Sequence, residues 1–87
     1  MKPNSRMDSP QPVEVIARFA PDGKITPLRF RWRGSLYTVE STGRRWQADD
    51  GCHILVLAGG GQMFELLFTA PDNRWYLAQA RSAPMAI

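Results

Sequence analysis

The clearest hydrophobic pattern in the chain runs from Leu28 to Ser41 and reads LRFRWRGSLYTVES. Before its glycine, this run alternates strictly between apolar and basic residues. The apolar positions are Leu28, Phe30 and Trp32, and the basic positions are Arg29, Arg31 and Arg33. Successive side chains of a β-strand point to opposite faces, so strict alternation is typical of a strand. The pattern therefore predicts an extended segment with one oily face and one cationic face.

The glycine of this run predicts a tight hairpin turn. Gly34-Ser35 fits a two-residue turn whose first residue has a positive φ, which costs glycine little. Pairing outward from that turn fixes a register. The predicted pairs are Arg33 with Leu36, Trp32 with Tyr37, Arg31 with Thr38, Phe30 with Val39, and Arg29 with Glu40. A hairpin alone is barely stable in water, so its apolar face is expected to pack against other elements.

The chain before this hairpin predicts two strands joined by a turn. Val13–Phe19 alternates apolar residues with a mixed set that includes Ile16. Pro21–Lys24 reads PDGK, which is a strong turn signal because proline presets the first dihedral and Asp-Gly completes the turn. Ile25–Arg33 follows as the second strand. Pro27 lies inside it without an N–H group, so that end is expected to be an edge or a bulge.

The middle of the chain is less regular. Thr42–Gly51 fits a bulged strand extension that carries Trp46 and ends in an Asp-Gly turn. Cys52–Leu57 is nearly continuous in apolar residues, as expected of a central strand covered on both sides. Gly59–Gly61 supplies the next turn.

The last part of the chain predicts another hairpin. Gln62–Thr69 and Arg74–Ala80 are strands, and Ala70–Asn73 is the four-residue loop between them. The predicted pairs are Phe68 with Trp75, Leu67 with Tyr76, and Leu66 with Leu77.

Together these segments predict an all-β fold with almost no helix. About six short strands in sequence favour a small antiparallel meander that forms a twisted sheet or a partly open barrel. Residues 1–12 hold three prolines and no apolar periodicity, so they are expected to be a disordered tail. Residues 13–81 form the single β domain, and residues 82–87 are expected to be a frayed end.

Composition narrows the classes of protein. At 87 residues the chain is long enough for one domain, and its 44% apolar residues indicate a folded core. A single cysteine excludes an internal disulfide and a cysteine-based zinc site. Without an apolar run of membrane-spanning length or a leader, we expect a cytoplasmic protein with no membrane partner. The net charge is +3, and arginine supplies most of the basic residues, which favours an anionic partner slightly.

Two short motifs resemble a small bacterial all-β domain family of unknown function. The resemblance extends over residues 13–80 and rests on an RFRWRG-type hairpin near the start and an FEL…WYL hairpin near the end. The matching positions are Arg29–Gly34 with Tyr37 and Val39, then Phe64–Leu66 and Trp75–Leu77. Members of that family are short stand-alone proteins or appendages, some of them on proteins similar to translesion DNA polymerases. The resemblance implies a fold more than an activity, and it brings no catalytic residues.

The arginine row is a candidate nucleic-acid site. Arg29, Arg31 and Arg33 would lie about 6.6–7 Å apart along one strand face, close to the phosphate repeat of a single strand. Arg44 and Arg45 could extend the row. The competing interpretation is that charges on a strand prevent edge-to-edge pairing. The predicted aromatic residues also lie on the opposite face, whereas a single-strand binder usually places them beside its cations.

Cys52-His53 is the only sequence that invites a catalytic interpretation. Adjacent residues of a strand point to opposite faces, so these two cannot act on each other as nucleophile and base. Asp49-Asp50 lies just before them, which makes a weak metal cluster conceivable. Buried cysteine and half-exposed histidine are nevertheless common structural residues. We therefore expect no catalytic residue, no metal and no cofactor.

A docking surface is the last candidate site. Trp46, Leu67 and Tyr76 are expected on the face opposite Phe68 and Trp75, where they could form an exposed apolar patch for a protein partner or a second copy. The alternative is a closed barrel whose outer apolar residues are scattered. The sequence thus predicts a non-enzymatic interaction module, with protein association, including self-association, as its function. The alternative is single-stranded nucleic-acid binding through the arginine-lined face, in association with DNA repair.

Overall fold

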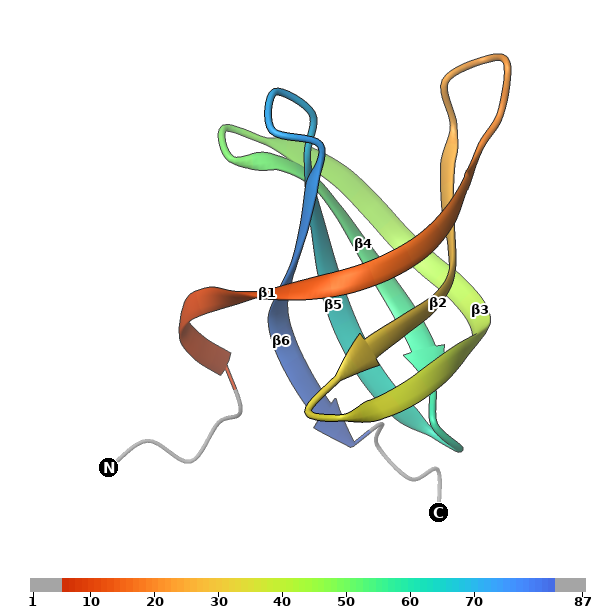
Figure 1. Cartoon of the computed structure of the whole chain (residues 1–87), viewed down its shortest axis with the longest axis vertical. Helices are drawn as coiled ribbons and strands as arrows, with labels where there is room; N and C mark the ends of the chain where they lie inside the picture. The colour runs from red at the N-terminus through yellow and green to blue at the C-terminus, as the bar shows by residue number, and fades with distance from the viewer. Residues whose placement is uncertain (1–5, 83–87) are drawn as a thin grey trace.

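Six antiparallel strands follow one another along the chain and close into a barrel in the computed structural model, which describes residues 6–82 (Figure 1). The strands are β1 (Arg6–Phe19), β2 (Ile25–Trp32), β3 (Ser35–Ala48), β4 (Gly51–Ala58), β5 (Gln62–Thr69) and β6 (Arg74–Ser82). Each strand pairs with the next, and β1 also pairs with β6. The predicted all-β meander of six strands is confirmed. The barrel is closed rather than partly open, and residues 6–82 contain no helix.

Two long, bent strands make this closure possible. β1 pairs with β6 through residues 6–13 and then with β2 through residues 14–19. β3 pairs with β2 through residues 35–38 and then with β4 through residues 39–48. Both strands contain register shifts, where a bulge bends the strand and increases its twist. Each long strand can therefore serve two neighbours, which lets six strands form a complete ring.

The ends of the domain differ from the prediction. The predicted N-terminal tail is wrong for residues 6–12, which belong to β1. They are held there by pairing with β6, in which Gln11 lies opposite Leu77 and Pro12 opposite Tyr76. β6 extends to Ser82, the first residue of the predicted frayed end. Residues 1–5 and 83–87, which make up the rest of the two predicted tails, lie outside the described residues.

The turn between β2 and β3 is also shifted from the prediction. It consists of Arg33 and Gly34, whose φ angles are 53° and 78°. Two positive φ angles are what a type I′ turn requires, and this turn matches the right-handed twist of a hairpin. The observed pairs are Trp32 with Ser35, Arg31 with Leu36, Phe30 with Tyr37, and Arg29 with Thr38. The register differs from the predicted one by two positions, so each side chain keeps its predicted face.

Most of the other local predictions are confirmed. The β5–β6 hairpin has the predicted pairs, from Phe68 with Trp75 to Leu66 with Leu77. β3 continues through the irregular segment with two register shifts, as predicted. The predicted Asp-Gly turn is wrong, because the turn consists of Asp49 and Asp50, and Gly51 already belongs to β4, where it pairs with Ala48. The expected irregularity near Pro27 is a register shift between β1 and β2.

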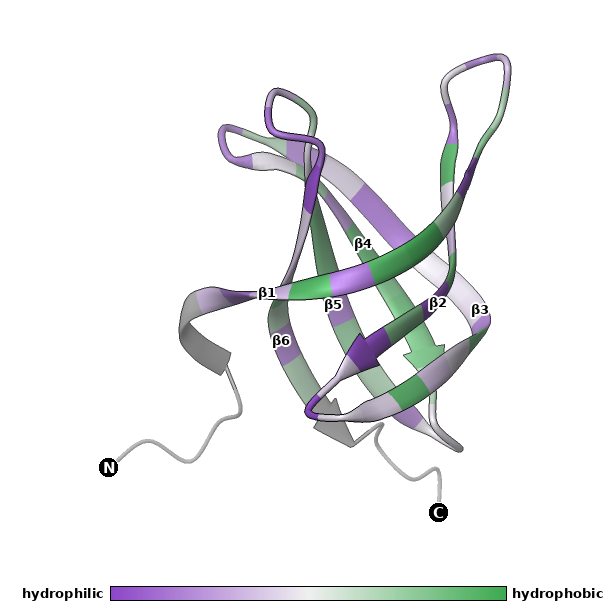
Figure 2. Ribbon diagram, in the orientation of Figure 1, coloured by the Kyte–Doolittle hydropathy of each residue, from purple (hydrophilic) through white to green (hydrophobic). Residues whose placement is uncertain are grey.

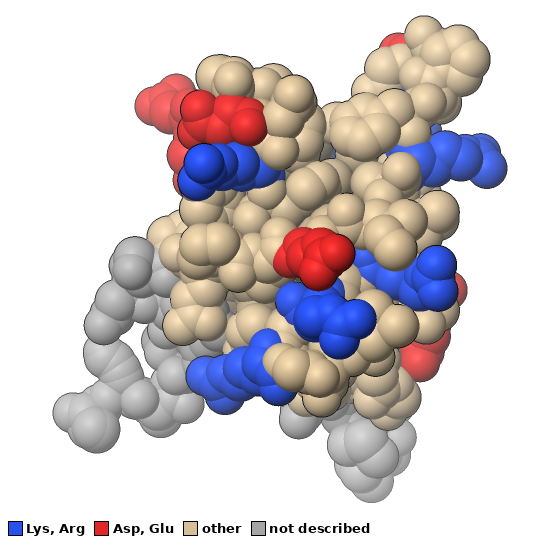
Figure 3. Space-filling view, in the orientation of Figure 1, with Lys and Arg blue, Asp and Glu red and all other residues tan. Residues whose placement is uncertain are grey.

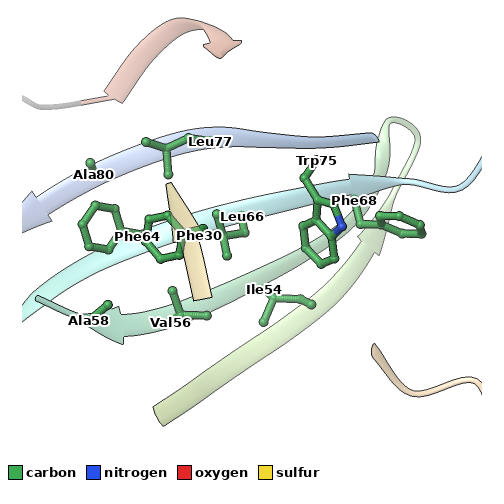
Figure 4. Close-up of a cluster of buried hydrophobic side chains, with 10 residues drawn as sticks. All are labelled: Phe30, Ile54, Val56, Ala58, Phe64, Leu66, Phe68, Trp75, Leu77 and Ala80. Atoms are coloured by element: carbon green, nitrogen blue, oxygen red, sulfur yellow. The ribbon is translucent and has the colours of Figure 1, made fainter. Parts of the chain in front are cut away.

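The barrel interior holds one apolar core. Figure 2 shows hydrophobic and hydrophilic positions interleaved along the strands, and Figure 4 shows core side chains from β2, β4, β5 and β6 pointing toward one another. The buried cluster consists of Phe30, Ile54, Val56, Ala58, Phe64, Leu66, Phe68, Trp75, Leu77 and Ala80. Inward positions alternate with outward ones along β4 and β5, as the barrel geometry requires.

Aromatic contacts fill the end of the barrel beside the β2–β3 turn. Phe30 stacks on Tyr37 with ring centroids 5.2 Å apart, and it meets Phe64 edge-on at 4.9 Å. Trp32 also meets Phe64 edge-on, at 5.8 Å. Such aromatic pairs add about 0.5–1.5 kcal/mol beyond the burial of their area. The shifted turn register therefore seats Tyr37 directly opposite Phe30 in the core.

Gly51 lies where the end of the β3–β4 turn packs closely against β5, so a substitution there tests this contact. Its φ is 137°, and an added Cβ would collide with the carbonyl oxygen of Phe68. Gly60 also has a positive φ, of 75°, but open space surrounds its Cβ position. We expect Gly60→Ala to lower the free energy of unfolding by about 1 kcal/mol, from backbone strain alone. We expect Gly51→Ala to cost about 2–5 kcal/mol, because overpacking adds to the strain.

Urea denaturation of the two variants measures this difference. Equal losses for Gly51→Ala and Gly60→Ala would contradict the close approach of β4 to β5 at this position.

Candidate binding faces

The predicted arginine row is shorter in the structure. Arg29 and Arg31 lie on the outer face of β2, as expected from their parity. Arg33 is not part of that row, because it occupies the turn and its guanidinium lies 4.4 Å from the ring centroid of Trp32. The shift of the turn by one residue takes Arg33 out of the strand and places it over an aromatic ring.

The two predicted extensions of the row lie elsewhere. The Nη1 group of Arg45 donates a hydrogen bond of 2.6 Å to the carbonyl oxygen of Ile25. That bond spans the region where β2 and β3 are no longer paired, so Arg45 links the two strands. The guanidinium of Arg44 lies 5.4 Å from the ring centroid of Trp46. The five predicted arginines therefore do not form one surface.

The predicted pair between Arg29 and Glu40 is also wrong. Arg29 lies opposite Thr38 in the observed register. The Oε2 atom of Glu40 instead accepts a hydrogen bond of 3.0 Å from the backbone N–H of Gly60. Glu40 thus supports the glycine turn between β4 and β5, and it does not neutralise the arginine face.

The outer face of β1, β2 and β3 combines charged and aliphatic side chains. One row across the three strands contains Glu14, Arg31 and Leu36, and the next contains Ile16, Arg29 and Thr38. Ile16 is 47% exposed and Leu36 is 51% exposed. Figure 3 shows basic groups gathered over this part of the molecule around an acidic group, whereas other acidic groups lie near the β3–β4 and β5–β6 turns. We call the set Glu14, Ile16, Arg29, Arg31 and Leu36 the mixed face.

The mixed face is slightly concave. Its side chains and the buried Phe30 line a hollow of about 120 Å³. The Nε atom of Arg31 lies 3.8 Å from Oε1 of Glu14, and both side chains are largely exposed. A pair at this distance in solvent contributes little to stability, so both groups remain available to a partner. Leu28, which is 42% exposed, adds a further aliphatic group on β2.

The predicted docking residues lie together on another part of the barrel. Strand pairing places them in one row across the outside, in the order Trp46, His53, Leu67, Tyr76 and Pro12. We call this row the outer belt. Leu67 is only 3% exposed, whereas Trp46 and Tyr76 are half-buried. A partner at the outer belt would therefore contact Trp46 and Tyr76. Leu67 lies between His53 and Tyr76 in the row and is too buried to add to the contact.

His53 lies in the outer belt between two carboxylates. Its Nδ1 atom is 2.7 Å from Oε2 of Glu65, and its Nε2 atom is 2.8 Å from Oδ1 of Asp50. The imidazole ring also stacks on Trp46, with centroids 5.1 Å apart and planes 8° from parallel. His53 and Glu65 are both buried. Both ring nitrogens must carry protons to donate to two carboxylates, so this geometry fits a histidinium ion.

The pKa values agree with that assignment. Burial acts to lower the pKa of His53, but the hydrogen bonds and negative charges of Asp50 and Glu65 outweigh it and raise the pKa above its ordinary value of 6.5. In turn, the hydrogen bond with His53 lowers the pKa of Asp50 below its ordinary value of 3.8. The two shifts have opposite signs because the same ion pair favours the charged form of each group.

The structure separates Cys52 from His53 as their adjacent positions on a strand predict. Cys52 packs against the interior core, whereas His53 lies in the outer belt. Within the described residues, no group of three or more His, Cys, Asp or Glu side chains could hold a metal ion. The carboxylates of Asp50 and Glu65 instead lie on opposite ring nitrogens of His53.

Sequence reasoning missed two features of these faces. Ile16 and Leu36 have the outward parity of their strands, and this parity was the available signal for an aliphatic contribution to the arginine face. Glu65 was the signal for a partner of His53, because it is the one charged residue in the apolar strand MFELLF. Only the register between β4 and β5 brings it beside His53.

The fold and these faces define a small closed antiparallel barrel with a charged and aliphatic outer face. No family model, curated protein or solved structure matches the chain.

The described residues also contain no helix that is long and apolar enough to cross a membrane.

The hydrogen bond from Arg45 to Ile25 predicts a structural role for this arginine. We expect Arg45→Gln to lower the free energy of unfolding by about 1–2 kcal/mol, because the carbonyl of Ile25 loses a charge-assisted bond. Arg44→Gln is the matched control, and it should change the free energy by less than about 0.5 kcal/mol, as is usual at exposed positions. Urea denaturation measures both. An Arg45 variant as stable as the Arg44 variant would contradict the structural role.

Proposed function

We propose that this protein is a non-enzymatic binding module that docks a protein segment carrying both carboxylates and aliphatic side chains. The proposed site is the mixed face on β1, β2 and β3. The observation that carries the proposal is the pair of half-exposed aliphatic residues, Ile16 and Leu36, set among Arg29 and Arg31 around a hollow.

The chemistry of the mixed face supports this kind of partner. Aliphatic groups that are about half exposed gain free energy when a partner covers them, at roughly 25 cal/mol for each Å² removed from water. The two guanidinium groups can each bind a carboxylate through two parallel hydrogen bonds. Because the contact combines apolar burial with directional charge pairing, the partner segment needs both kinds of group.

The charge balance favours a different protein over a second copy. The mixed face has two arginines against one glutamate, and the weak pair between Arg31 and Glu14 leaves the arginines accessible. Two copies docked face to face would bring like charges together, which is unfavourable. An acidic segment meets the positive face without this repulsion. Self-association, the other interpretation of the sequence, is therefore less well supported at this site.

The geometry gives less support to single-stranded nucleic acid. Only Arg29 and Arg31 of the five predicted arginines share the mixed face, and the carboxylate of Glu14 lies beside them. Stacking platforms for bases are aromatic, and the one aromatic residue lining this hollow, Phe30, is buried in the core. The resemblance to a bacterial family, including its link with polymerase-like proteins, stays a prediction.

The engagement of His53 supports a non-enzymatic role. Both of its ring nitrogens are occupied by carboxylates, and the Cys52 thiol lies on the other side of the strand. Neither group is placed as a general base beside a nucleophile.

A titration with synthetic peptides tests the proposal. The probe is a short soluble peptide of alternating glutamate and leucine, and its matched control replaces every glutamate by lysine. Amide shifts of the isotope-labelled protein at low ionic strength should change at Ile16, Arg29, Arg31 and Leu36 when the acidic peptide is added, and they should stay unchanged with the lysine peptide.

Reversing the two arginines tests their part in this binding. We expect the double variant Arg29→Glu with Arg31→Glu to weaken the binding of the acidic peptide at least tenfold, about 1.4 kcal/mol, because it reverses the charge of the mixed face. The charge-matched control is Lys24→Glu with Arg74→Glu, which reverses two charges at exposed positions outside the mixed face and should leave the affinity unchanged.

A second double variant separates the two classes of partner. Ile16→Ser with Leu36→Ser keeps the arginines, so it should weaken the acidic peptide about fivefold or more while hardly affecting an oligothymidylate. Binding of the acidic peptide that ignores Ile16 and Leu36 would contradict the proposal. Salt-dependent binding of the oligothymidylate at this face, without binding of the peptide, would support the nucleic-acid alternative instead.

A further inference from the structure

The mixed face does not involve the ion-pair cluster on the other side of the barrel. His53 joins two elements there, because Asp50 belongs to the β3–β4 turn and Glu65 to the centre of β5. Glu65 is a buried member of a strand paired on both sides. The side chain of Asp50 is 57% exposed in a two-residue turn, so it is the partner that can leave more easily.

We propose that His53 is a proton-dependent latch that holds the tip of the β3–β4 hairpin against the sheet. When the imidazole is charged, it donates to Asp50 and Glu65 at once. When it is neutral, it has one N–H and can donate to only one carboxylate, while its lone pair repels the other. Release of Asp50 resolves the conflict at the smaller cost, because Glu65 is held in place by the sheet.

The groups around the His53 ring determine how readily it gains or loses its second proton, and so whether the latch is closed or open. Trp46 of β3 covers one face of the imidazole, and the guanidinium of Arg44 lies beyond Trp46. Asp49 shares the turn with Asp50. Leu67 of β5 lies opposite His53, and Tyr76 and Gln79 of β6 lie opposite Leu67 and Glu65. Burial acts to lower the pKa of His53, but the hydrogen bonds and negative charges of the two carboxylates outweigh it and raise that pKa.

Opening of the latch would change the shape of a neighbouring hollow. Residues 47–52 form one wall of a hollow of about 390 Å³, and residues 68–72 of the β5–β6 hairpin form the other. Asp50 lies in the turn at the tip of the first wall, so its release lets that turn change its conformation beside the hollow, while the paired residues of the wall stay in place. The latch is therefore a conformational device that lets the proton concentration set the form of this end of the barrel.

The pH window follows from the directions of the two shifts. A raised pKa of His53 means that its contribution to stability is complete below its unfolded value and is lost as pH rises through the folded value. The lowered pKa of Asp50 means that its contribution is present above its unfolded value and is lost as pH falls through the folded value. The latch is thus closed between these limits, and it opens on the alkaline side by loss of the imidazole proton.

Nuclear magnetic resonance tests the latch directly, because the chain has a single histidine. Below pH 6.5 we expect both imidazole nitrogens to have the shifts of protonated nitrogens. The titration midpoint should lie above 6.5, and the amide signals of Asp50 and Gly51 should follow the same midpoint. The β2–β3 turn at Arg33 and Gly34, which does not line this hollow, is an internal reference that should not follow it.

Two matched variants complete the test. Asp50→Asn should lower the midpoint of His53 and uncouple the hairpin amides from it, whereas Asp49→Asn should do neither. His53→Gln should remove this pH dependence of the turn while the core signals of Leu66 and Leu77 confirm the fold. A titration midpoint of His53 at or below 6.5, or a midpoint that Asp50→Asn leaves unchanged, would overturn the proposal.

Discussion

The structure depends on one constraint, which is that a chain this short must bury one face of every strand in a single interior. A flat sheet of six strands would leave its apolar face uncovered, because residues 6–82 contain no helix to pack on it. Curling the meander into a ring lets that face cover itself. The ring closes only because β1 and β3 bend and pair with two neighbours each. The bulges in these strands are thus as necessary to the fold as the apolar core.

Closure also determines what lies outside. Once the inward positions are filled by Phe30, Phe64 and Leu66, every alternate side chain must face solvent or a neighbour on the outer surface. On β1, β2 and β3 these outward residues are arginines, a glutamate and half-exposed aliphatic groups. On β4 and β5 they include His53 and Glu65, which satisfy each other. The barrel therefore has a solvent-exposed mixed face, which supports the proposed docking of a peptide segment. It also has an ion-pair cluster around His53, which supports the proposed latch.

Much of this arrangement could be predicted from the sequence, because period-2 alternation depends only on local geometry. The loop of the β5–β6 hairpin and its three predicted pairs are confirmed, since a four-residue loop rich in turn formers left one consistent register. The register shift beyond Leu66 was not predicted. The β2–β3 turn was not predicted correctly, because Gly34 fits a tight turn either with Arg33 before it or with Ser35 after it. Both turns would match the twist of a hairpin, so the turn sequence does not choose between them. The observed register places Tyr37 opposite Phe30, where the two rings stack, and that contact depends on packing in the barrel. The ion-pair cluster was missed for a related reason, since Asp50 and Glu65 meet His53 only once the turn and the β4–β5 register are known.

The register of the β2–β3 hairpin is the point at which the account is most directly tested, because it places Leu36 beside Arg31 on the mixed face. Antiparallel pairs outside the hydrogen-bonded positions bring their α-protons close together, so they give strong nuclear Overhauser effects. With Arg33 and Gly34 in the turn, we expect a strong α-proton contact between Arg31 and Leu36. A strong contact between Trp32 and Tyr37 instead would mean that the turn is Gly34-Ser35, and it would contradict the mixed face described above.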